Sequence, residues 1–427
     1  MAGVYVVGGL GLIGPSRAVP RKPPAADRPS AGPLRGANLA ATIARLLERV
    51  DSVPNDFLAW ASLGLAYVEQ TKVTVDPSYY PRAEIALERS LSINTADNYG
   101  AAAGMSALAA GRHDFTLAKK WAEKGLMINP ANAILYGALA DAETQLGNYP
   151  SAFANVQQMA DRAPDSASLS RVSYTWELRG QIDFARTYMQ RALQDATSPA
   201  GRAFALYYLG ELAFNQGSPV EALRHYTSGL KADASYAPNL EGKAKAEAAL
   251  GQTAAALSDY SEVVDRVPQP TYLIEYGELL QSLGRKQDAE KQYVLFEAEQ
   301  KIFLANGAVG DVDPTLFYAN HGQSKRALLV GERAITNRGF LEMNDAYAWA
   351  LHLNNRNAEA LEWSAKALQL GTRSALFLYH SGMIHKAIGN NNEARTALTT
   401  ALQLNPHFNP LAAPLARQAL AQLGPQT

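Results

Sequence analysis

Alanines recur along this chain about every 34 residues, and this period is the feature that most constrains its fold. The gaps between successive alanines stay between 33 and 38 residues over most of the chain. The ten positions are Ala83, Ala118, Ala152, Ala185, Ala222, Ala256, Ala289, Ala327, Ala360 and Ala394. A period of this length is typical of a repeat array and not of a single globular core.

A glycine lies five residues before most of these alanines, and Asn355 takes the same place before Ala360. The glycines are Gly147, Gly180, Gly217, Gly251, Gly284, Gly322 and Gly389. Glycine and asparagine tolerate the left-handed backbone that closes a helix, so each unit is predicted to be a helix, a turn and a second helix. Proline cannot continue a helix, and prolines mark the ends of several second helices, namely Pro130, Pro164, Pro268 and Pro406.

Both segments of a unit carry apolar residues at helical spacing. In the first unit they form the pattern W-x2-L-G-x2-Y along one helical face, with Trp60, Leu63, Gly64 and Tyr67. A tyrosine recurs at one place of the second segment in later units, which predicts that it packs between helices; these residues are Tyr226, Tyr260 and Tyr293. The first unit departs from the pattern because residues 76–81 lengthen its turn.

The motif, the turn residues and the period together resemble the tetratricopeptide repeat family over residues 57–423. The resemblance implies an all-α fold, in which about ten antiparallel helix pairs stack into a right-handed superhelical solenoid with a concave groove and a C-terminal capping helix. The C-terminal third, from Asp345 to Phe408, also resembles bacterial tetratricopeptide proteins to which no activity is assigned.

The first 37 residues differ in composition from the rest. Residues 2–13 are apolar and rich in glycine, and residues 15–35 are rich in proline, alanine and basic side chains without a helical period. We interpret residues 1–37 as an apolar leader and a tether, residues 38–54 as an N-terminal capping helix and residues 55–427 as the solenoid. The leader is shorter than a membrane span, so an export signal with a membrane tether, which we favour, and a disordered cytoplasmic tail both stay open.

Composition and motifs exclude several classes of chemistry. The chain has 39 basic and 40 acidic residues and a net charge of -1, which argues against a nucleic-acid binder, and it has no cysteine to act as a nucleophile or metal ligand. Its seven histidines show no metal-ligand spacing. Gly9, Gly11 and Gly14 form G-x-G-x-x-G, but the prolines that follow disfavour the helix that a dinucleotide site requires. We therefore predict no catalytic, cofactor-binding or metal-binding residues.

The family resemblance implies that the first helix of each repeat lines the concave face. The candidate peptide-binding residues at such positions are Arg171, Tyr174, Tyr207, Tyr208, Glu211, Tyr379, His380 and Met383. Tyrosine combines a large apolar ring with a polar tip, which suits peptide recognition, but tyrosines at helical spacing also pack between repeats, and both interpretations stay open.

We predict from these features a non-enzymatic scaffold or adaptor that binds a protein or peptide segment in its concave groove. The alternative is an accessory subunit of a cell-envelope enzyme complex, which would contact the complex through the convex face or the N-terminal tether.

Overall fold

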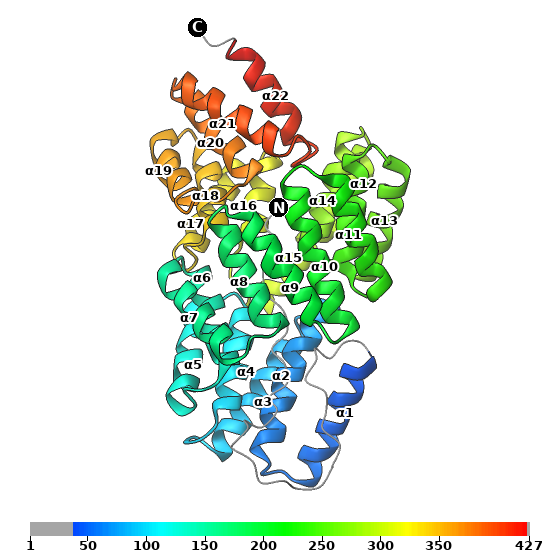
Figure 1. Ribbon diagram of the computed structural model, residues 1–427, viewed down its shortest axis with the longest axis vertical. Coiled ribbons are helices and arrows are strands. Elements are labelled where there is room, and N and C mark those ends of the chain that lie inside the picture. The colour runs from blue at the N-terminus through cyan, green and yellow to red at the C-terminus, as the bar shows by residue number, and fades with distance from the viewer. Residues whose placement is uncertain (1–36, 425–427) are drawn as a thin grey trace.

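The computed structural model describes residues 37–424, and every regular element in this part of the chain is an α-helix (Figure 1). The predicted leader and the glycine motif at residues 9–14 lie outside the described residues. In chain order the helices are α1 Ala37–Ser52, α2 Phe57–Thr74, α3 Tyr79–Ile93, α4 Tyr99–Gly111, α5 Phe115–Ile128, α6 Ala133–Gln145, α7 Tyr149–Arg162, α8 Ser166–Leu178, α9 Ile182–Asp195, α10 Pro199–Asn215, α11 Pro219–Ala232, α12 Ala237–Ala249, α13 Thr253–Arg266, α14 Pro270–Ser282, α15 Lys286–Ala305, α16 Val312–Asn320, α17 Ser324–Ile335, α18 Leu341–Leu353, α19 Asn357–Ala367, α20 Ala375–Ala387, α21 Asn391–Leu404 and α22 Ala412–Gln422.

The helices from α2 to α21 pack as consecutive pairs, and each pair packs on the next. The repeated alanines lie at these interfaces and are fully buried, because helices can approach closely only where the side chains are small. At the two ends α1 packs on α2, and α22 packs on α20 and α21. The predicted all-α solenoid is confirmed, while the handedness of the superhelix, the number of repeats and the division into leader, cap and solenoid stay predictions.

The turns between paired helices have the backbone that the sequence predicts. The seven turn glycines have φ between 68° and 82°, and Asn355 has φ 61°. His113 holds the same position five residues before Ala118, with φ 63°, although histidine is not a residue that the pattern predicts there. The first unit is different, because α2 ends at Val75 with φ 56° and the inserted residues lead directly into α3.

The three second-helix tyrosines pack between helices as predicted, since Tyr226, Tyr260 and Tyr293 are all buried. Tyr226 fits because glycines face its ring from both neighbouring first helices. A Cβ atom on Gly210 or on Gly242 would lie 2.3 or 2.4 Å from the Tyr226 Cε1 atom. Glycine at these two positions is therefore a packing requirement and not a turn signal.

The solenoid coils far enough for units about 190 residues apart to touch. Residues 112–217 lie against residues 309–405 along a contact that we call the seam, with α6 and α8 next to α17 and α18 (Figure 1). The backbone N–H of Leu341 donates to Tyr149 Oη at 2.8 Å, and Asn405 Nδ2 donates to the Phe214 carbonyl at 2.8 Å. The seam thus joins the middle of the chain to its C-terminal third.

The turns at Gly147, Gly180 and Gly217 are the points of closest approach at the seam. A Cβ atom on Gly180 would lie 2.2 Å from the Gly371 carbonyl oxygen, and equivalent atoms at the other two turns would meet carbonyl oxygens at 2.5 and 2.6 Å.

Among the described helices, none is both long and apolar enough to cross a membrane.

Candidate functional site

The concave side of the solenoid forms a cavity of about 530 Å³, lined from both sides of the seam. One wall comes from α8, α10, α12 and α14, with Tyr174, Tyr207 and Tyr272 among its residues. The facing wall includes Glu342 of α18 and Phe377 of α20. The volume lies within the range of ordinary ligand pockets, so this cavity is the candidate site.

Tyrosines dominate the wall formed by the middle of the chain. They are Tyr174, Tyr207, Tyr208, Tyr236 and Tyr272. The Tyr207 ring lies 5.1 Å from the Tyr208 ring and 6.2 Å from the Tyr236 ring, and both pairs are near perpendicular. Burial raises the pKa of Tyr207 and Tyr208 well above the ordinary value, so both phenols keep their protons at neutral pH.

Carboxyl groups lie among and opposite these rings. Lys245 Nζ lies 2.7 Å from Glu211 Oε1 and 3.2 Å from Glu241 Oε1, so one ammonium is shared between two carboxylates. The Tyr226 hydroxyl also donates to Glu211 Oε1. The Glu211 carboxylate therefore already has hydrogen-bond donors from this chain, so a ligand would have to bind other carboxyl groups.

Three carboxyl groups of the lining hold their protons more tightly than usual. Burial, reinforced by the charge of Asp311, raises the pKa of Asp313 to about 7, and burial raises the pKa of Glu342 to about 7. Burial and the neighbouring Glu275 carboxylate also raise the pKa of Glu241. Each of these groups can ionise when a positive charge arrives beside it.

Glu342 Oε2 on the facing wall is buried, and no described residue donates a hydrogen bond to it. Glu241 is 2% exposed, but its Oε1 atom already has the Lys245 ammonium at 3.2 Å. Buried polar atoms in folded proteins nearly always have a partner, so the Glu342 oxygen indicates a place where a ligand donates.

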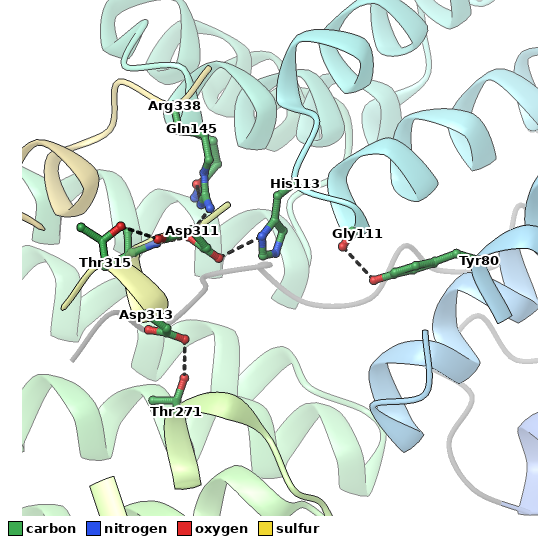
Figure 2. A network of polar contacts seen from close by, with 10 residues as sticks. Tyr80, Gly111, His113, Gln145, Thr271, Asp311, Asp313, Thr315 and Arg338 are labelled. Atoms are coloured by element: carbon green, nitrogen blue, oxygen red, sulfur yellow. Dashed lines mark hydrogen bonds and ion pairs between the residues drawn. The ribbon is translucent and has the colours of Figure 1, made fainter. Parts of the chain in front are cut away.

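A polar network at one end of the cavity ties the seam together (Figure 2). Arg338 binds Asp311 Oδ1 and also reaches the Gln145 side chain, and His113 Nδ1 lies 2.9 Å from Asp311 Oδ2. Burial alone would raise the pKa of Asp311, but the charges of Arg338 and His113 lower it below the ordinary value. Asp311 therefore stays ionised and links residues that are far apart in the sequence. Beside it, Thr271 Oγ1 donates to Asp313 Oδ2 at 3.0 Å.

Half of the residues predicted to bind a peptide line the cavity, namely Tyr174, Tyr207, Tyr208 and Glu211. Arg171 lies nearby but outside the cavity lining. Its Nε atom lies 3.0 Å from Asp141 Oδ1 and its Nη2 atom 2.7 Å from Asp141 Oδ2, so the guanidinium is buried in a two-point ion pair. We therefore assign Arg171 a structural role.

The other three predicted residues do not reach the cavity. The Tyr379 ring lies between Trp349 and Phe408, at 5.6 Å from each ring. His380 stacks on Trp349 at 4.3 Å, and its Nδ1 atom lies 2.8 Å from Asp345 Oδ2. Met383 packs against the same apolar cluster. These three residues are part of the core and are left out of the proposed site.

Several residues that line the cavity are not among those predicted from the sequence. Tyr236, Glu241, Tyr272 and Glu275 come from the next two helix pairs, and Glu241 lies 15 residues before its repeated alanine, as Tyr207 does. That shared position was a usable signal. No sequence signal identifies Glu342, because it reaches the cavity only through the coiling of the solenoid.

Known proteins resemble this chain in two ways. Sequence models described as tetratricopeptide repeat match residues 242–296 and residues 375–408. Similar solved structures include the human IFIT1 dimer with PPP-AAAA, at 15% identity over 86% of this chain and 87% of that chain, with a TM-score of 0.48. They also include Cut9 in the Cut9–Hcn1 hetero-tetramer of the APC/C, at 14% identity over 90% and 82%, with a TM-score of 0.40. PilF of Pseudomonas aeruginosa aligns at 15% identity over 56% and 99%, with a TM-score of 0.37. No curated protein sequence matches the chain.

The two sequence matches lie in different parts of the same array, and helix pairs with buried alanines and left-handed turns continue between and around them. The chain therefore contains tetratricopeptide repeats, which the sequence models match at residues 242–296 and 375–408.

Proposed function

We propose that this protein is a non-enzymatic scaffold that binds a short segment of a partner protein in its central cavity. The observation that carries the proposal is the wall of tyrosines from four successive first-helix regions, which lines the cavity. Tyrosine rings supply contact area at a low cost in conformational entropy, and they are enriched among the residues that dominate binding energy.

The size of the cavity favours a segment over a folded domain. A volume of about 530 Å³ holds a few side chains, and the facing wall leaves no flat surface on which a globular partner could rest. The accessory-subunit alternative depends on residues 1–37, of which the structure describes only the last, or on the convex face, and no observation on the described residues favours it.

Selection from a displayed library of random linear peptides, followed by affinity measurement on the purified protein, tests the proposal. The Tyr207→Ala, Tyr208→Ala double variant should weaken the selected peptides by at least about tenfold, which corresponds to about 1.4 kcal/mol. The matched control is Tyr136→Ala with Tyr188→Ala, because these tyrosines are also half-buried but do not line the cavity. Failure to select any peptide, or equal weakening by both double variants, would contradict the proposal.

A further inference from the structure

We infer that the cavity binds a cationic side chain, a lysine or an arginine of the bound segment, between the tyrosine wall and the Glu342 carboxyl group of the facing wall. The inference rests on the proposed function for the source of the cation. The recognition chemistry itself follows from the cavity lining alone.

The charges of the lining favour a cation. Eight carboxyl groups line the cavity, against two lysines and one arginine. Lys72 pairs with Glu69 at 2.8 Å, Lys245 is shared by two glutamates, and Asp311 is held by Arg338. Of the other carboxyl groups, Glu275, Asp313 and Glu342 form no ion pair with any described residue. The eight acidic residues of the lining are Glu69, Glu177, Glu211, Glu241, Glu275, Asp311, Asp313 and Glu342.

The carboxylate oxygen that has no hydrogen-bond donor identifies the kind of group that is missing. Glu342 Oε2 is buried in the wall that faces the tyrosines. An ammonium carries three donors and no acceptor, and a guanidinium carries five donors in a plane, so either group can serve a buried carboxylate without adding a new unsatisfied acceptor. A phosphate or a peptide carboxylate would supply only acceptors and would meet the repulsion of the acidic lining.

The aromatic wall suits the same ligand. The face of a tyrosine ring is electron-rich and attracts a cation, most strongly where water is excluded. Tyr207, Tyr208 and Tyr236 stand nearly edge to face, so their rings point in different directions around one space. Rings in this arrangement can surround the methylene stem and the charged end of a long basic side chain.

Binding of a cation should also release protons. Asp313 and Glu342 each have a pKa of about 7, so both are partly protonated at neutral pH. A cation beside them lowers their pKa, and the linkage then requires the affinity to rise as the pH rises through about 7. An apolar or anionic ligand would not show this sign of pH dependence.

The test uses the peptides selected above, each resynthesised with norleucine for lysine or citrulline for arginine, which removes the charge with little change in length. We expect one such replacement to weaken binding by at least about tenfold. Glu342→Gln should weaken the charged peptides and reduce the rise of affinity with pH, whereas the exposed control Glu262→Gln should do neither. Circular dichroism establishes that both variants are folded.

The peptide replacements need no change in the protein, so the inference can be tested even if Glu342→Gln does not fold. If peptides bind through Tyr207 and Tyr208 but neutral replacements bind equally well, the inference is overturned and the proposed function stands. If no peptide is selected, titration with Nα-acetyl-lysine methylamide, which keeps the free ε-ammonium, against its norleucine analogue decides. Binding of the lysine compound alone, lost in Glu342→Gln, keeps the inference and overturns the peptide function, and binding of neither overturns both.

Discussion

The α10–α11 pair in the middle of the chain and the α20–α21 pair near its end carry the same residue types at equivalent positions but in opposite surroundings. Tyr207 and Tyr379 both lie 15 residues before a repeated alanine, and Gly217 and Gly389 both lie five residues before it. In the middle pair the tyrosine lines the cavity and the glycine is pressed against the Leu404 carbonyl. In the last pair the tyrosine is buried and nothing lies within 4 Å of a Cβ on the glycine.

The reversal follows from the coiling of the solenoid. Residues 404–405, directly after α21, sit on the turn between α10 and α11, so the middle pair is covered on its outer turn by a later part of the chain. The turn of the last pair meets no such later segment. Inside the coil, Trp349 and Phe408 cover Tyr379, whereas Tyr207 lines the cavity. Repeat position alone therefore does not decide whether a residue binds or packs.

The largest expected difference between the two pairs concerns stability. Tyr379→Ala empties a core position and should cost about 3–5 kcal/mol in the free energy of unfolding, whereas Tyr207→Ala should cost less than half of that because its ring borders a cavity. Urea denaturation followed by circular dichroism measures both. Peptide affinity should follow the opposite order, with Tyr379→Ala binding normally under conditions where it is folded. Equal losses of stability would show that the two positions do not differ as the structure indicates.

A second prediction uses pH to titrate a buried carboxyl group at the contact between the C-terminal segment and the middle of the chain. Asn409 Nδ2 donates to Glu278 Oε2 at 2.6 Å, and burial raises the pKa of Glu278 to about 7 although this hydrogen bond lowers it. Because the folded-state pKa is raised, the stability that Glu278 contributes is fully present below its ordinary pKa of 4.5 and is lost as the pH rises through about 7.

Glu278→Gln removes this titration, so the wild type should lose up to about 3 kcal/mol relative to the variant between about pH 5 and about pH 8. Denaturation of both proteins across this range measures the difference, and the exposed Glu262→Gln should follow the wild type. Parallel pH profiles for wild type and Glu278→Gln would mean that Glu278 does not titrate in this range.

The elements of the fold could be predicted from sequence because they are set by local contacts. Turn glycines, repeated alanines and capping residues act within one unit. Each unit, such as the α10–α11 pair that contains Tyr226, then stacks on its immediate neighbours. The seam could not be predicted in this way. It depends on a small rotation at every repeat, accumulated over about 190 residues, so no local pattern indicates that Phe214 meets Asn405.

The candidate site was predicted in part for the same reason. Tyr174, Tyr207 and Tyr208 were found because first helices line the concave face in the family that the chain resembles. Glu342 was missed because only the closed coil brings it opposite them, and His380 was selected because its position did not reveal that Trp349 would cover it.

A third prediction compares the two turns directly. Alanine at Gly217 or Gly389 has to adopt φ of 72° or 82°, which costs about 1–2 kcal/mol at either position. Only at Gly217 does the new Cβ also meet a carbonyl oxygen, at 2.6 Å, so Gly217→Ala should cost about 2 kcal/mol more than Gly389→Ala. Urea midpoints of the two variants measure this excess. If the excess is missing, the seam is looser at this turn than the structure shows.

The smallest effect isolates one hydrogen bond of the seam. Asn405 and Asn129 both lie 11 residues after a repeated alanine and both precede a proline, and each side chain accepts a hydrogen bond from the backbone two residues later. Asn405 alone of the two also donates across the seam, to the buried Phe214 carbonyl. Asn405→Ala should therefore cost about 1 kcal/mol more than Asn129→Ala, because it removes the cross-seam hydrogen bond to that carbonyl, while the local hydrogen bond from the Gly217 N–H remains. Hydrogen exchange should rise at residues 214–218 in Asn405→Ala and stay unchanged there in Asn129→Ala. Equal costs and unchanged exchange in both variants would mean that the coil is held closed by packing, and that the polar contacts of the seam only fix its register.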